Sequence, residues 1–119
     1  MSRLTEWWAR RRTARQPGLV TATSMDEVLV MSAEGGNTSA MCRLGDQLMR
    51  QGRAAEAKHW FRKAADSGST DGMNNLGYLL VQEGQLSQAE SWLAKAAERG
   101  HPEAIDNLAY VRSRRPGTS

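Results

Sequence analysis

The sequence contains few side chains of the types that catalyse reactions or hold metal ions, and these lie far apart along the chain. His59 and His101 are the only histidines, and Cys42 is the only cysteine. A nucleophilic cysteine needs a base such as histidine beside it, and a metal site needs several ligands at short spacings. Neither pattern occurs in the sequence. We therefore predict no catalytic residues, no metal site and no cofactor.

Carboxylates are the remaining candidates for chemistry. Asp46, Asp71, Glu103 and Asp106 would form an acid–base pair only if the fold brought two of them together. A solvated helix face is the commoner setting for such residues. His101 lies in a predicted loop, where a helix-capping role is favoured over catalysis. The sequence therefore indicates a protein that is not an enzyme.

Charge is unevenly distributed along the 119 residues, which have a formal net charge of +3. Residues 1–19 carry a balance of +4 and residues 112–119 a balance of +3, whereas residues 20–111 carry −4. Basicity confined to the ends is weak evidence for a nucleic-acid-binding fold. A single cysteine, no long apolar run and no signal-peptide pattern predict a cytoplasmic protein. The basic N-terminal arm includes Arg10, Arg11, Arg12 and Arg15.

An internal repeat predicts the elements that position these residues. The pair Leu44-Gly45 recurs 32 residues later as Leu76-Gly77, and a further 32 residues later as Leu108-Ala109. So many matches at one interval indicate a repeated structural unit. Further pairs at this interval are Gly52 and Gly84, Ala57 and Ala89, Trp60 and Trp92, and Lys63-Ala64-Ala65 and Lys95-Ala96-Ala97.

Each unit divides into two predicted helices. The first spans about 38–50, where apolar residues are spaced three and four apart. Gly52 follows and permits a turn with positive φ, because glycine has no Cβ. The second helix spans about 54–67, and Gly68 follows it as a left-handed C-cap. The next unit repeats this plan.

The sizes of the repeated residues predict how the helices pack. Gly45 and Gly77 lie inside predicted helices, where glycine costs about 1 kcal/mol relative to alanine. Glycine at such a position, despite this cost, indicates that a neighbouring side chain occupies the space where a Cβ would lie. We expect Trp60 and Trp92 to be buried between layers of the stack, filling the gaps between units.

These motifs resemble the tetratricopeptide and Sel-one-like repeat families over roughly residues 37–111. The Lys-Ala-Ala-x-x-Gly ending and the tryptophan resemble the Sel-one-like family, whereas the short turns after Gly52 and Gly84 resemble the tetratricopeptide family. The subfamily stays open at this point. The resemblance implies an all-α fold, a short right-handed α-solenoid of helix–turn–helix repeats.

The segments outside the repeats are less regular. Ser24 to Glu27 matches a capping box and predicts a helix, although Val28 to Met31 is rich in residues that favour a strand. Residues 1–16 have three interpretations: a cap on the first repeat, a mobile arm that contacts an acidic partner, nucleic acid or anionic membrane, or a disordered segment. The predicted organisation is an N-terminal arm and linker over 1–23, a helical domain over 24–115 and a frayed tail over 116–119. The helical domain is predicted to consist of a degenerate helix at 24–35, full repeats at about 37–68 and 69–100, and a terminal helix at 102–114.

The resemblance implies that the first helix of each unit lines a concave groove, so that the protein is an adaptor or scaffold for another protein or peptide. Tyrosines, a methionine and carboxylates in the groove suit a partner with basic and apolar groups. Self-association is a further expectation, because so few repeats leave both ends uncovered. The alternative function is binding of nucleic acid or an anionic surface through the arginine-rich ends. The predicted groove residues are Ser39, Cys42, Asp46, Met49, Asp71, Asn74, Tyr78, Val81, Gln82, Glu103, Asp106 and Tyr110.

Overall fold

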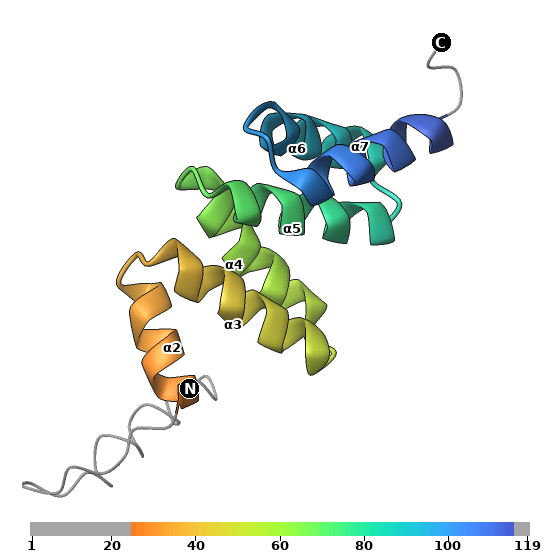
Figure 1. Cartoon of the computed structure of the whole chain (residues 1–119). Coiled ribbons are helices and arrows are strands. Elements are labelled where there is room, and N and C mark those ends of the chain that lie inside the picture. The colour runs from red at the N-terminus through yellow and green to blue at the C-terminus, as the bar shows by residue number, and fades with distance from the viewer. Residues whose placement is uncertain (1–24, 116–119) are drawn as a thin grey trace, which may run out of the picture.

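The computed structural model describes residues 25–115, and every regular element in that range is an α-helix. The helices follow one another in chain order along an open stack, with the first and last helices at opposite ends (Figure 1). The fold is therefore an all-α helical repeat solenoid. The elements are α2 (Met25–Glu34), α3 (Thr38–Arg50), α4 (Ala54–Asp66), α5 (Thr70–Gln82), α6 (Leu86–Glu98) and α7 (Pro102–Arg114).

Local signals in the sequence set the helix boundaries. The side chains of Asn37 and Ser69 accept hydrogen bonds from backbone N–H groups in the first turns of α3 and α5, at 2.9 Å and 3.0 Å. Gly52 and Gly68 have φ angles of 75° and 93°, which end α3 and α4 in the left-handed region as predicted. These caps confine every repeat helix to the same length of 13 residues.

The segment before the first full unit is the helix α2, which confirms the helical alternative over the strand. It packs against α3 as the second helices α4 and α6 pack against the first helices that follow them. Ala33 of α2 is fully buried in that contact. Ser24, the predicted capping residue, lies outside the described residues, and so does the arm at 1–23.

Within each complete unit a large side chain of the second helix occupies the space left by a glycine of the first. A Cβ on Gly45 would overlap the ring of Phe61, and a Cβ on Gly77 would lie 2.6 Å from Cγ of Leu93. Both neighbours are buried. The predicted close approach at these glycines is therefore confirmed.

The identity of the side chains that fill these spaces was predicted wrongly. Trp60 and Trp92 are only partly buried, at the edge of the core, while Phe61 and Leu93 enter it. Successive residues of a helix point about 100° apart, so only one of two adjacent apolar residues can face the first helix squarely. The contact of Phe61 and Leu93 with glycine also lies within a unit, whereas the prediction had placed the tryptophans between units.

Contact between units is made by small residues. A Cβ on Gly72 of α5 would lie 2.7 Å from the Cβ of Ala64 and 2.8 Å from the backbone nitrogen of Ala65, both on α4. Backbone this close to backbone admits no side chain larger than hydrogen. The second helix of one unit is thereby fixed against the first helix of the next.

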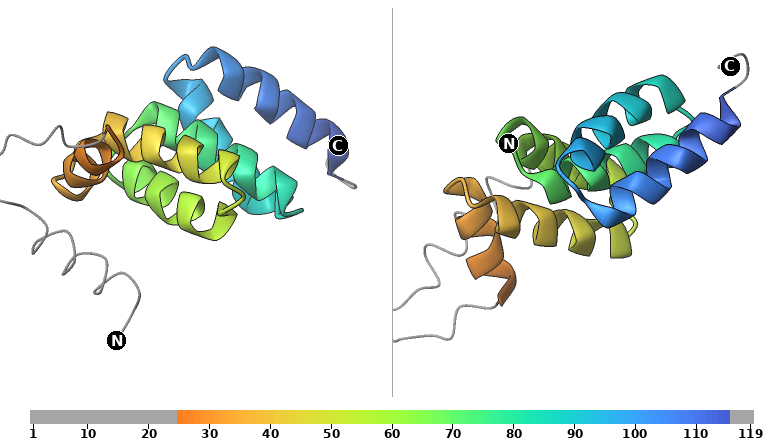
Figure 2. Two further views of the ribbon diagram at one scale, coloured as in Figure 1. Left: turned by 90° about the horizontal axis from the view of Figure 1, so that it is seen from below. Right: turned by 45° about the horizontal axis from the view of Figure 1, so that its top comes forward.

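The stack curves, and the first helices lie on its inner side. α3 contacts α5, and α5 contacts α7, whereas no such contact joins the second helices α4 and α6 within the described chain. Elements on the inside of a curved stack approach one another more closely than those outside. Figure 2 shows the stack from two further directions, with α7 remote from α2. The concave face is therefore formed by α3, α5 and α7.

Candidate functional site

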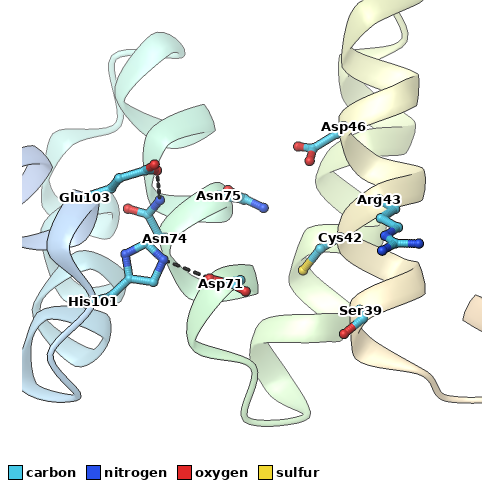
Figure 3. A pocket seen from close by; sticks show the side chains of 9 residues that line it. All are labelled: Ser39, Cys42, Arg43, Asp46, Asp71, Asn74, Asn75, His101 and Glu103. Atoms are coloured by element: carbon cyan, nitrogen blue, oxygen red, sulfur yellow. Dashed lines mark hydrogen bonds and ion pairs between the residues drawn. The ribbon is translucent and has the colours of Figure 1, made fainter.

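A pocket of about 410 Å³ opens on the concave face between α3 on one side and α5 and α7 on the other. Figure 3 shows side chains of α3 facing those of α5 and α7 across this gap. The contributions come mainly from the N-terminal halves of the three helices, which the repeat places side by side. The lining residues are Ser39, Cys42, Arg43, Asp46, Asp71, Asn74, Asn75, His101 and Glu103.

The pocket brings together carboxylates from three successive first helices, Asp46, Asp71 and Glu103. The pKa of the Asp46 carboxyl is raised above its ordinary value, mainly by burial; Arg50 lowers it, and the charge of Asp71 raises it again. Among the described residues, the Asp46 carboxylate has no hydrogen bond and no ion pair. An acid in this setting gains from any cation that enters the pocket.

His101 connects the start of α7 to α5. Its Nδ1 accepts a hydrogen bond from the backbone N–H of Ala104 at 3.2 Å, so it caps α7 as predicted. Because Nδ1 is the acceptor, the ring proton of the neutral imidazole is on Nε2, which donates to Oδ1 of Asp71 at 2.9 Å. The imidazole therefore holds the Asp71 carboxylate in place at the pocket wall.

Asn74 forms the buried base of the same wall. Its side chain is only 3% exposed, and its Nδ2 donates to Glu103 at 3.4 Å while its Oδ1 accepts from Asn107 at 3.0 Å. A buried amide with both ends bonded is a structural link. Asn74 thus joins α5 to α7 and orients the Glu103 carboxylate. A ligand in the pocket would contact the side chains around Asn74 rather than the Asn74 amide.

Cys42 lines the pocket but has no catalytic environment. Burial raises the pKa of its thiol, which outweighs the opposite effect of Ser69, whose Oγ lies 3.8 Å from Sγ. Nearby Asp71 and Asp46 raise the pKa further. A reactive cysteine needs the reverse, a lowered pKa. Cys42 contributes shape and a weakly polar surface.

The structure places the predicted groove residues in two groups. Ser39, Cys42, Asp46, Asp71, Asn74 and Glu103 line the pocket. The remainder belong to α3, α5 and α7 but are not among its lining residues: Met49, Tyr78, Val81, Gln82, Asp106 and Tyr110. Tyr78 and Tyr110 are exposed, at repeat-equivalent positions of α5 and α7, where Asp46 stands on α3. They extend the concave face beyond the pocket.

Sequence reasoning missed three lining residues, Arg43, Asn75 and His101. Arg43 and Asn75 each directly follow a predicted groove residue, so they lie one position further around the same helix. His101 was assigned only a cap, although a capping side chain at the start of α7 necessarily lies at the edge of the groove. The 32-residue spacing would have placed it beside the caps Ser69 and Asn37.

The basic ends were the other candidate site. Arg10, Arg11, Arg12 and Arg15 lie outside the described residues. At the C-terminal end, Arg112 and Arg115 both form ion pairs with Glu90 of α6, and the Arg114 guanidinium lies 5.0 Å from the ring centroid of Tyr110. Arg112 and Arg115 thus attach the end of α7 to α6, whereas Arg114 packs on a residue of its own helix.

The convex side carries a second group of aromatic and basic residues. Lys63 and Lys95 place Nζ 5.3 Å and 4.7 Å from the ring centroids of Trp60 and Trp92, and Cζ of Arg62 lies 6.0 Å from the Trp92 centroid. A cation over an indole face is attracted by the ring quadrupole. Arg62 on α4 thus bridges to α6 on the outer side of the stack.

Over residues 25–115, no cluster of three or more His, Cys, Asp or Glu has the arrangement of a metal site. Within the same range, no helix has both the length and the apolar character needed to cross a membrane.

Comparison with known proteins agrees with this architecture. A family model described as tetratricopeptide repeat matches residues 38–67 and 70–99, which together make half of the chain. These two segments coincide with the helix pairs α3–α4 and α5–α6. Neither the curated proteins nor the solved structures gave a match. Tetratricopeptide repeats are generally protein-interaction modules and typically have no enzymatic activity. The chain belongs to the tetratricopeptide repeat family.

Proposed function

We propose that this protein is an adaptor or scaffold module that binds a peptide segment of a partner protein along the concave face, and that the segment carries basic and apolar side chains. The observation that carries this proposal is the Asp46 carboxylate. It lies in the pocket with a raised pKa and, among the described residues, with no hydrogen bond and no ion pair. A protein gains no stability from such a group.

The charge of the pocket favours a basic ligand. Asp46, Asp71 and Glu103 line it together with a single described cation, Arg43. A lysine or arginine side chain between α3 and α5 would reach both Asp46 and Asp71. It would also offset the burial and the charge of Asp71, which together raise the pKa of Asp46. An acidic ligand would add to the negative charge.

The apolar preference comes from the exposed tyrosines. Tyr78 and Tyr110 occupy equivalent positions of α5 and α7, and each keeps about half of its surface exposed. Aromatic side chains on a binding face provide large contact area at low entropic cost, and tyrosine is enriched among residues that dominate interface energies. A peptide bound in the pocket and continuing along the groove would cover them.

Fluorescence anisotropy with defined peptides tests this function. The probe is a labelled peptide of alternating lysine and leucine, and the comparison peptide has glutamate in place of lysine. We expect the basic peptide alone to bind. Replacing Asp46→Asn together with Asp71→Asn should weaken binding about tenfold or more, because a hydrogen bond to a charged group contributes about 1.5–3 kcal/mol.

Asp66→Asn provides the matched control, because Asp66 is an exposed carboxylate on α4, away from the concave face. It should leave affinity unchanged. Tyr78→Ala combined with Asp46→Lys should also weaken binding while circular dichroism shows that the helices are retained. Equal affinity for both peptides, or binding that the double asparagine variant leaves intact, would refute the proposal. Loss of folding in the Tyr78 variant would mark that residue as structural.

A further inference from the structure

Within residues 25–115, one helix pair is incomplete at each end of the stack: α7 has the position of a first helix that no second helix follows, and α2 has the position of a second helix that no first helix precedes. Of the five large hydrophobic residues that are exposed in this range, three lie on these two end helices and are not groove residues: Val28, Met31 and Ile105.

The open face of α7 is the face that receives a second helix in the complete units. Ile105 is 50% exposed, whereas its repeat equivalents Met41 and Met73 are 3% and 4% exposed. Ala109 is exposed too, and it stands where Gly45 and Gly77 accept large side chains. α7 therefore presents an open face at the position where α3 and α5 receive a second helix, with an alanine in place of their glycine.

The open face of α2 is the complementary one. By the same interval, Leu29 of α2 corresponds to Phe61 and Leu93, the side chains that enter the space beside glycine. Those two residues are buried, whereas Leu29 is only partly buried and the neighbouring Val28 is 47% exposed. Within the part of the chain that the structure describes, α2 therefore presents the inserting residue with no first helix to receive it.

We infer that a second copy of this chain completes the unit: α2 of one copy packs on the open face of α7 of another, with Leu29 beside Ala109 and α2 displaced from the position that α4 takes on α3 by the Cβ of Ala109. The same chain supplies both halves of the contact. The inference is independent of the peptide-binding function, because it uses the ends of the stack rather than the concave face.

Charge favours this pairing in the orientation that the repeat dictates. In a unit the end of the first helix lies beside the start of the second, because only a short turn joins them. The start of α2 carries Asp26 and Glu27, and the last turn of α7 carries Arg112 and Arg114. Placing α2 of one copy on α7 of another brings these opposite charges together, which adds orientation and association rate to the apolar contact.

The rest of the sequence is a poor substitute for the second copy. Pro116 stands in register with Gly52 and Gly84, and proline cannot adopt the positive φ of those turns. Ahead of α2, Arg12 and Gln16 stand where the first helices carry buried leucines. The 32-residue register thus gives this segment a charged and an amide side chain in place of those leucines.

The contact is head to tail, so each copy would use two different surfaces. Such an interface builds either an open chain with a free face at each end or, where the rotation closes, a ring. Sedimentation equilibrium of the full chain should therefore show an average mass that rises with concentration above the 13.1 kDa of one copy. A mass that stays at one copy throughout the range would overturn the inference.

Charged substitutions identify the surfaces. Ala109→Glu on α7 and Val28→Glu on α2 should each reduce the average mass to that of a single copy. Both positions are exposed, so folding should be retained, and circular dichroism checks this. Ile105→Glu repeats the test of the α7 face. Ala55→Glu is the matched control, an exposed alanine of α4 whose substitution should leave association unchanged.

Mixing the two variants gives the decisive measurement. The Ala109→Glu chain keeps an intact α2 face and the Val28→Glu chain keeps an intact α7 face, so an equimolar mixture should form a dimer of one copy of each and grow no further. A symmetric contact of α7 with α7, or of α2 with α2, predicts no such rescue. Failure of the mixture to dimerise would contradict the head-to-tail arrangement.

Discussion

The interior units and the end helices have the same repeat pattern but different surroundings. Met41 and Met73 are buried in units where a second helix follows, whereas Ile105 at the equivalent position of α7 is exposed. The first helices α3, α5 and α7 have the same length of 13 residues, and a side chain caps each of them. The repeat therefore determines local structure in every unit, while burial and its energy depend on which neighbouring helix is present. Substitutions at equivalent positions measure this difference.

The largest expected effect is in the core between units. Leu76→Ala removes a fully buried side chain and should lower the free energy of unfolding by about 2–5 kcal/mol, through lost burial and the remaining cavity. Ile105→Ala removes a half-exposed side chain of α7 and should cost about 1 kcal/mol or less. Urea denaturation followed by circular dichroism, at low protein concentration, measures both.

The dilute condition matters for Ile105, because association would bury it. Repeating its denaturation at high protein concentration should increase the cost of Ile105→Ala and leave that of Leu76→Ala unchanged. Equal costs for the two substitutions in dilute solution would mean that α7 is covered by something other than a second copy, and the contrast between interior and end would fail.

The second prediction concerns the glycine positions that distinguish complete units from the end. Gly45→Ala should destabilise the protein by up to about 2 kcal/mol, because overlap with Phe61 costs about 1–3 kcal/mol and the gain in helix propensity recovers only about 1 kcal/mol. In a Phe61→Val background the overlapping ring atoms are absent, so the same substitution should become neutral or stabilising. Thermal and urea unfolding of the wild type, the two single variants and the double variant give the coupling energy between positions 45 and 61.

At the position of α7 that is equivalent to Gly45, the protein already has an alanine, Ala109. Within the described residues of one copy, no side chain covers it. A destabilisation by Gly45→Ala that persists unchanged without the Phe61 ring would show that the glycine is needed for another reason, such as helix–helix backbone contact.

Much of the fold was predictable because its determinants are local and repeated. Gly52 and Gly68 mark the ends of helices by their backbone freedom, and the interval of 32 residues gives each helix its partner. The choice of Phe61 over Trp60 was not predictable from spacing, since both are apolar neighbours and side-chain size favoured the wrong one. Only the direction of each side chain relative to α3 decides it.

The candidate site was predictable to the level of the helix face. Asp46, Asp71 and Glu103 were expected to share the groove, and they do line one pocket. The contact of His101 with Asp71 joins residues 30 positions apart and follows from packing of α7 on α5, which no local pattern encodes. The same packing buries Asn74, which sequence reasoning treated as a ligand-binding residue.

The third prediction contrasts acids of the two regions. The folded-state pKa of Asp46 is raised, so its ionisation opposes folding, and stability is lost as the pH rises through that pKa. Asp46→Asn should therefore modestly raise the melting temperature at neutral pH while weakening binding of the basic peptide. The stabilisation should vanish in acid, below the ordinary pKa of 3.8, where the wild-type carboxyl is protonated in both states. Stabilisation that persists in acid would point to a cause other than charge.

The smallest expected effect is at the end helix. Glu90 of α6 pairs with Arg115 and Arg112, and the hydrogen bond from Arg115 is the main reason that the pKa of this carboxyl lies below its ordinary value. A lowered folded-state pKa gives stability the opposite dependence on pH to that at Asp46. The stabilisation is present above the unfolded-state pKa and is lost as the pH falls through the folded-state pKa. Glu90→Gln should therefore slightly lower stability at neutral pH and have no effect in strong acid.

Salt separates this contribution further, because exposed ion pairs are screened by added ions. The difference between wild type and Glu90→Gln should shrink in high salt, whereas the cost of Leu76→Ala should not. Hydrogen exchange of the last turn of α7 should show the same dependence on pH and salt. If it does not respond to Glu90→Gln, then this end of the stack is held by Val111, which is fully buried, and the arginines contribute only charge for the neighbouring copy.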